Sequence, residues 1–140
     1  MFKATVLLTA FLATAICFSP TSVSAQTDFD AFWSKFKTAV VSGDKEAVAS
    51  MTRFPLTMPF GMKAVRTRAE LLKRYDGIFN KEADAARCFQ ASKPVKEQKA
   101  YAVWCTFKES PESSDNRPIQ YSFVKTKSGW KFGGLDNINE

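Results

Sequence analysis

The sequence has 140 residues, 45% hydrophobic and 24% charged, with 20 Lys and Arg against 14 Asp and Glu and a formal net charge of +6. This composition fits one ordinary globular domain and excludes collagen, a coiled-coil rod, a long disordered tail and a multidomain protein. The sequence contains no histidine, which excludes Ser-His-Asp and Cys-His catalysis and the histidine-based zinc and haem sites. We predict no cofactor and no metal site.

The first 25 residues have the three parts of a secretory signal peptide. Lys3 supplies a positive charge, residues 6–18 are almost wholly apolar, and the small residues of a cleavage site end at Ala25. The apolar run is shorter than the roughly 20 residues that span a bilayer. We therefore expect cleavage near Ala25 and a single mature domain, residues 26–140, that is secreted or periplasmic and has no stable membrane span. An uncleaved membrane tether is the alternative.

Two helices are expected at the start of the mature domain. Thr27 is a suitable N-cap, and large apolar side chains then recur at helical spacing through Val41. They are Phe29, Phe32, Trp33, Phe36, Ala39 and Val40. This stripe indicates a core face more than a docking face, because every ring fits the same inward side. Gly43 fits the residue after the helix, and Asp44 can cap a short second helix.

The next segment is extended. Two prolines within residues 54–61 exclude a helix and allow at most a short edge strand. Met58, Phe60 and Met62 in and beside this segment either line the mouth of a cavity or form a contact in a homodimer, because methionine-rich surfaces adapt to varied partners.

A third helix is predicted from the capping-box pattern at Thr67 through Phe79. Residues 80–87 either extend this helix or form another turn. Just before and within it, Lys63, Arg66 and Arg68 concentrate positive charge. This charge is either a solvated helix face or a site for an anion outside the cytoplasm, such as phosphate, a lipid headgroup or a cell-wall polymer. Secretion makes nucleic acid an unsuitable partner.

The remainder of the chain favours strands. Residues 89–95 are a candidate strand although Pro94 interrupts them, and residues 100–107 alternate as a strand with Trp104 on the face opposite Tyr101. Residues 109–116 form a polar loop, and a terminal hairpin follows with its turn at residues 127–129. Cys17 is expected to leave with the signal peptide, so Cys88 and Cys105 remain as an even pair in an oxidising compartment, which predicts one disulfide. A reactive thiol pair is the alternative, but the spacing is not CxxC.

Helices followed by antiparallel strands indicate an α+β fold. The order, with the aromatic helix at residues 29–40, Gly43-Asp44, the helix at residues 67–79 and the final Gly129-Trp130-Lys131-Phe132, resembles the nuclear transport factor 2-like superfamily (SnoaL-like proteins included). The resemblance implies a cone-like single domain in which N-terminal helices pack in a curved antiparallel sheet. It also implies a cavity at the open end. This scaffold hosts isomerases, dehydratases, immunity proteins and binding modules.

The implied cavity gives two sets of candidate residues. For acid and base chemistry they are Asp76 as base with Tyr75 or Tyr121 as hydrogen-bond donor, and Asp136 is a further acid near the end. The alternative for Tyr75 is a core residue, and for Asp76 a solvated carboxylate at the edge of the apolar stripe. The candidates for contact with a ligand are Trp33, Met58, Phe60, Met62, Tyr101 and Trp104.

Three functions remain compatible with the sequence. The first is a secreted or periplasmic, non-catalytic binding module for a small hydrophobic or anionic ligand. The second is a histidine-free acid/base isomerase or lyase that acts on a hydrophobic small molecule. The third is an inhibitor or immunity-type protein that binds a partner protein, with residues 109–116 as the protruding loop.

Overall fold

The computed structural model describes residues 26–59, 63–108 and 117–139. The helical segments are α1 (Gln26–Ser42), α2 (Lys45–Ser50), α3 (Arg68–Asp76), the π-helical turn η1 (Gly77–Lys81) and α4 (Ala85–Ala91). The strands are β1 (Thr52–Thr57), β2 (Val95–Glu97), β3 (Ala100–Cys105), β4 (Ile119–Thr126) and β5 (Gly129–Asp136). None of the helices within these ranges is long and apolar enough to cross a membrane. Phe60, Met62, the predicted loop 109–116 and the predicted signal peptide lie outside the described residues.

The predicted helix ends are confirmed by their hydrogen bonds. Gly43 has a φ of 69°, the left-handed conformation that glycine adopts at least cost after a helix. The Asp44 carboxylate accepts a hydrogen bond from the Ala47 amide at 3.0 Å and caps α2. The Thr67 hydroxyl accepts from the Glu70 amide at 3.2 Å and caps α3. These caps satisfy amides that have no partner within their own helix.

Two predicted elements differ in the structure. The third helix changes to π-helical geometry after Asp76, because the Glu82 amide bonds to the Gly77 carbonyl, five residues earlier, at 3.1 Å. The strand predicted at residues 89–95 is wrong: its first residues belong to α4, and β2 begins only at Val95. The Asp84 side chain accepts a hydrogen bond from the Arg87 amide at 3.2 Å and starts this helix, which buries Phe89. Local capping therefore prevails over the strand tendency of a short apolar run.

The strands form one open sheet in the order β1-β5-β4-β3-β2. All neighbours pair antiparallel except β1 and β5, which are parallel. No hairpin joins β1 to β5, so the connection does not impose an antiparallel direction. A shift in register between Ser122 and Phe123 marks an irregularity that bends the sheet. The predicted fold class, α+β with N-terminal helices packed in a curved sheet, is confirmed, with the difference that the sheet is mixed.

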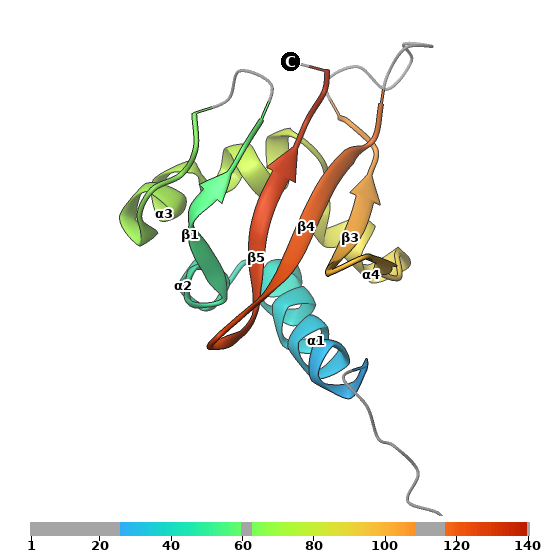
Figure 1. The fold of residues 1–140 in the computed structure, drawn as a ribbon. Helices are drawn as coiled ribbons and strands as arrows, with labels where there is room; N and C mark the ends of the chain where they lie inside the picture. Colours follow the sequence, from blue (N-terminus) through green and yellow to red (C-terminus); the bar gives the residue numbers. More distant parts are fainter. Residues whose placement is uncertain (1–25, 60–62, 109–116, 140) are drawn as a thin grey trace, which may run out of the picture.

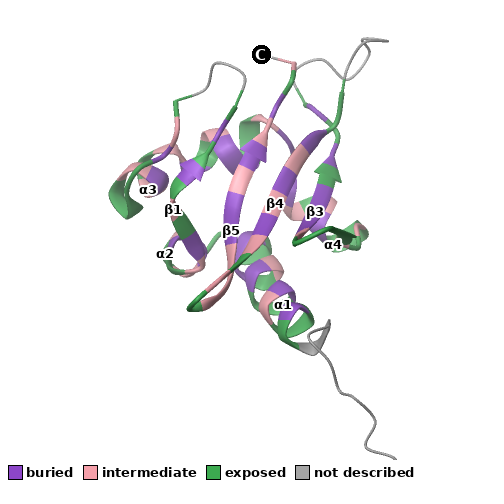
Figure 2. Ribbon diagram, viewed as in Figure 1, coloured by how far each residue is buried: buried purple, intermediate pink, exposed green. Residues whose placement is uncertain are grey.

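The core lies between the helices and the inner face of the sheet. In Figure 1, α1 passes behind β4 and β5. Along β4, buried and partly exposed residues alternate, as the colours of Figure 2 show. Phe36 of α1 is fully buried, and its ring lies 5.2 Å from Phe123 and 5.6 Å from Phe132 between ring centroids. The predicted aromatic stripe is therefore a core face.

Candidate functional site

Aromatic rings fill much of the space between the helices and the sheet, where the sequence predicts a cavity. Trp33 is 8% exposed and packs against Phe89 and Phe123 at centroid distances of 5.2 and 5.5 Å. Tyr101 is 5% exposed and its ring stacks on Phe29 at 3.6 Å. Neither Trp33 nor Tyr101 lines any of the four surface depressions that are described below. Their contacts are with other core residues, and a role in ligand contact stays a prediction.

The two candidate tyrosines are buried beside each other, although only one hydroxyl has a partner. The Tyr121 hydroxyl donates to the Ile78 carbonyl at 2.7 Å. The buried Tyr75 hydroxyl has no hydrogen-bond partner among the described residues. Burial, and then the nearby carboxylates of Asp76 and Asp44, raises the pKa of Tyr75 to about 12. Burial first, then Glu82 and Tyr75, raises the pKa of Tyr121 above its usual value. Both hydroxyls therefore stay protonated at neutral pH.

The candidate base does not face these hydroxyls across a groove that the described residues line. The Asp76 side chain is 62% exposed and forms an ion pair with Lys45 at 3.2 Å. It also accepts a hydrogen bond from the side-chain nitrogen Nδ2 of Asn80 at 3.0 Å. The Lys45 ammonium lies 5.2 Å from the centre of the Tyr75 ring. This carboxylate is exposed and ion-paired, and it is not buried as a general base in a cavity would be. The geometry therefore gives the isomerase hypothesis no support.

The three candidate anion-binding cations, Lys63, Arg66 and Arg68, are exposed. Arg68 is paired with the Glu46 carboxylate. The Arg66 amide donates to the Glu70 carboxylate at 2.8 Å, which places a negative charge at the start of α3. The Lys63 carbonyl accepts a hydrogen bond from Arg74 at 2.7 Å. Met58, which is buried, lies on the same side, with its sulfur 3.7 Å from Arg74. This region therefore resembles the solvated helix face that was the alternative for these cations.

The predicted disulfide between Cys88 and Cys105 is present and joins α4 to the end of β3, with the Cα atoms 5.8 Å apart. A groove of about 540 Å³ lies along this junction. Its apolar surface comes from Ala91, Phe107 and the two cysteines, and Trp104 forms part of its wall with 38% of the residue exposed. Of the predicted ligand-contact residues, Trp104 is one that lines a groove in the described part of the chain.

Both signs of charge border this α4–β3 groove. Arg87 and Lys108 lie on it together with Asp84. The Asp84 carboxylate already caps α4, and the Lys108 ammonium donates to the Asn80 carbonyl at 3.2 Å. No carboxylate of the described residues pairs with the exposed Arg87 guanidinium. The groove thus combines an aromatic wall with two cations, which suits a ligand that is apolar and anionic.

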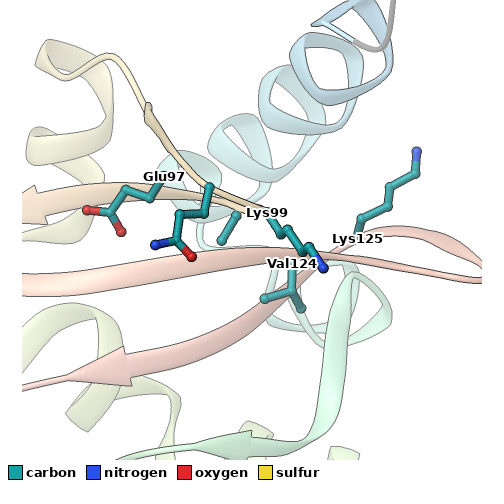
Figure 3. Close-up of a pocket in the computed structure, with 6 residues that line it drawn as sticks. Glu97, Lys99, Val124 and Lys125 are labelled. Atoms are coloured by element: carbon teal, nitrogen blue, oxygen red, sulfur yellow. The ribbon is translucent and has the colours of Figure 1, made fainter.

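A second depression, of about 660 Å³, lies at the turn between β2 and β3. Figure 3 shows Glu97 from the end of β2, Lys99 from the turn, and Val124 and Lys125 from β4. The Lys125 ammonium pairs with Asp28 at 3.3 Å and lies 5.5 Å from the centre of the Trp130 ring. The residues that line this depression are mostly polar and exposed, and Val124 is the one branched aliphatic residue among them. This depression is a weaker candidate than the α4–β3 groove.

Sequence patterns identified only part of the groove. Trp104 and the two cysteines are predicted from strand alternation and cysteine count, whereas Arg87 and Lys108 are not. The capping position of Asp84 was a usable signal for a helix that begins at residue 85. The predicted disulfide ties residue 88 to this strand, but no local pattern shows which side chains of the helix face the groove.

No family model matches the chain, and no curated protein matches it. Solved structures do resemble it. An NTF2-like protein with a cystatin-like fold from Novosphingobium aromaticivorans is 15% identical, with a TM-score of 0.43 over 80% of this chain and 79% of that chain. A ketosteroid isomerase-like protein from Erwinia carotovora atroseptica is 17% identical, with a TM-score of 0.42 over 81% and 96% of the two chains.

An NTF2-like protein of unknown function from Burkholderia xenovorans is 11% identical, with a TM-score of 0.49 over 79% of this chain and 81% of that chain. These structures are described as NTF2-like or ketosteroid isomerase-like, the superfamily that the sequence resembles. At such identities and TM-scores the likeness concerns the fold, and no activity follows from it for this chain.

Proposed function

We propose that this protein is an exported, non-catalytic binding module that holds a small ligand in the α4–β3 groove. The observation that carries the proposal is the exposed indole of Trp104 in a groove that also presents Arg87 and Lys108. A partly exposed tryptophan in a concave surface is a common anchor for ligands. The two cations select an anionic group, such as a carboxylate, sulfonate or phosphate.

A disulfide and a backbone hydrogen bond hold the elements that form the walls of the groove in place. The disulfide fixes α4 to β3, and the Lys108 amide donates to the Glu82 carbonyl at 2.9 Å, which holds the far end of the groove. A groove whose walls are fixed before binding loses little conformational freedom when a ligand enters. The ligand therefore needs no large closing movement.

The chemistry of the buried groups supports a non-catalytic role. The sequence has no histidine, the Tyr121 hydroxyl is already bonded to the Ile78 carbonyl, and Asp76 is exposed and ion-paired. General acid-base catalysis needs a donor and an acceptor within reach of one bound substrate. The carboxylate that lines the α4–β3 groove is that of Asp84, and it is already engaged as a helix cap.

Export by the predicted signal peptide is part of the same proposal. A structural disulfide is typical of proteins in an oxidising compartment, and the bond between Cys88 and Cys105 supports this location. Expression of the full chain in a bacterial host should yield a periplasmic or secreted protein whose amino-terminal sequence starts near Gln26. A mature protein that still carries residues 1–25 would contradict this part of the proposal.

The binding proposal is tested with 8-anilinonaphthalene-1-sulfonate, a fluorescent arenesulfonate that has both required features. We expect dye binding to weaken at least about tenfold in the double variant Arg87→Gln and Lys108→Gln, because each lost charge-assisted contact contributes about 1.5–3 kcal/mol. Trp104→Ala should weaken binding as well. The matched control carries Arg66→Gln and Lys73→Gln, which remove the same charge from the α3 region. Equal dye affinity in the two double variants would contradict the proposal.

A further inference from the structure

One carboxylate oxygen on the outer face of the sheet has no hydrogen-bond partner among the residues that the structure describes. Asp136 lies near the end of β5, opposite Gln120 of β4. Its neighbours Leu135 and Asn137 are fully buried on the helix side, so the alternation of a strand turns Asp136 to the outer face. The Asp136 Oδ1 atom is covered by the protein and has no hydrogen-bond donor among the described residues. Polar atoms in this condition are rare in folded proteins and call for an explanation.

This carboxylate borders two adjoining depressions. One, of about 300 Å³, is lined by Trp104, Arg117, Pro118, Gln120, Asp136 and Ile138. The other, of about 190 Å³, shares Gln120 and Asp136 with it and continues over Gly133 and Gly134. The first depression holds opposite charges, because Arg117 and Asp136 both line it. Among the described residues, no ion pair joins these two groups or takes up either one.

The same depression has an apolar surface that the fold leaves uncovered. Ile138 is 50% exposed and Trp104 is 38% exposed, and they are two of the four large hydrophobic residues that are exposed in the described ranges. Pro118 completes the apolar lining. Exposed apolar residues that gather in one concavity, with a few polar groups, are the usual composition of a small-molecule site.

We infer that this depression binds a small zwitterion of the amino-acid type. The ligand's ammonium group pairs with the Asp136 carboxylate, its carboxylate pairs with Arg117, and its aliphatic side chain packs on Trp104 and Ile138. This small site has one positively and one negatively charged side chain that are not paired with each other. A ligand that carries both signs and no net charge matches them. The volume is at the lower end of the range for ligand pockets, about 300–1,000 Å³, which suits a single amino acid. This zwitterion site is separate from the α4–β3 groove, although Trp104 borders both.

The test uses isothermal titration calorimetry with three probes of the same aliphatic skeleton. L-Leucine carries both charges, 3-methylbutylamine lacks the carboxylate, and 4-methylpentanoate lacks the ammonium. The titrations use protein in which Arg87 and Lys108 are replaced by Gln, so that an anionic probe cannot bind in the α4–β3 groove. We expect leucine to bind at least about tenfold more tightly than either single-charge probe, because each charge adds a charge-assisted contact.

Single variants assign each charge to its residue. Asp136→Asn should reduce the affinity for leucine to that for 4-methylpentanoate, and Arg117→Gln should reduce it to that for 3-methylbutylamine. Asp30→Asn and Arg53→Gln are matched controls at exposed positions elsewhere and should leave leucine binding unchanged. Thermal unfolding of each variant checks that the fold persists.

Two results would overturn the inference. One is tighter binding of the amine than of leucine, which would identify a site for cations alone. The other is no binding of leucine up to about 10 mM by a folded protein, which is expected if Arg117 closes onto Asp136 and the two side chains satisfy each other. Dye binding in the α4–β3 groove of protein with native Arg87 and Lys108 should be unaffected by Asp136→Asn, so failure here is distinguishable from failure of the proposed function.

Discussion

Removal of the disulfide should destabilise the protein by an amount that the structure allows us to calculate. Cys88 and Cys105 are 17 residues apart in the sequence, and in the chain-entropy model a loop of this length contributes about 3 kcal/mol to the free energy of unfolding. Unfolding of about 115 residues carries an entropy of about 240 cal/mol/K, so the loss of about 3 kcal/mol lowers the melting temperature by about 12 °C.

The assay is thermal unfolding followed by circular dichroism, with and without a reductant. Reduction of the native protein keeps both sulfur atoms in place, so its effect isolates the cross-link from the packing of Cys105, which is 2% exposed. The double variant Cys88→Ala and Cys105→Ala should melt at or below the temperature of the reduced protein and should not respond to reductant. A decrease below about 4 °C on complete reduction would refute the reasoning, because it corresponds to about 1 kcal/mol.

Two further predictions concern the sheet and the buried tyrosine. Gly133→Ala should destabilise the fold by about 1–3 kcal/mol in chemical denaturation, because the new Cβ would lie 2.6 Å from a methyl carbon of Val124. Val124→Ala in the same chain should restore much of the lost stability. Equal losses of stability in the single and double variants would exclude this contact as the cause. The pKa of Tyr75 is about 12 in the folded protein against 10.0 as its ordinary value, so between pH 10 and 12 the folded state keeps a proton that the unfolded state releases. The contribution of Tyr75 to stability should therefore be constant below pH 10 and fall over that interval. Because burial also raises the pKa of Tyr121, Tyr75→Phe should reduce but not abolish the alkaline decline in urea midpoints measured against pH, and an unchanged decline would contradict the assignment.

Much of the fold follows from short-range patterns in the sequence. The cap at Asp44, the cap at Thr67 and the turn at Gly129 depend on hydrogen bonds and dihedral angles within a few residues, and such signals are complete in the local sequence. The alternation along β4 likewise records which side chains face the core. The strand predicted at residues 89–95 failed because a short apolar run fits either a strand or a buried helix, and the cap at Asp84, which favours the helix, was not used in the prediction.

The candidate sites depended on contacts between distant segments. The sequence by itself predicted the disulfide between Cys88 and Cys105 from the cysteine count, and it put Trp104 on the face of its strand opposite Tyr101, because a period of two is a local property. Only the tertiary structure placed Arg87 beside Lys108, set Asp136 near Arg117 and turned Asp76 toward solvent. These arrangements arise when α4 packs on β3 and β5 pairs with β4. The free energy that favours them comes from burial of apolar surface contributed by residues across the whole chain. No short stretch of sequence contains that set of residues.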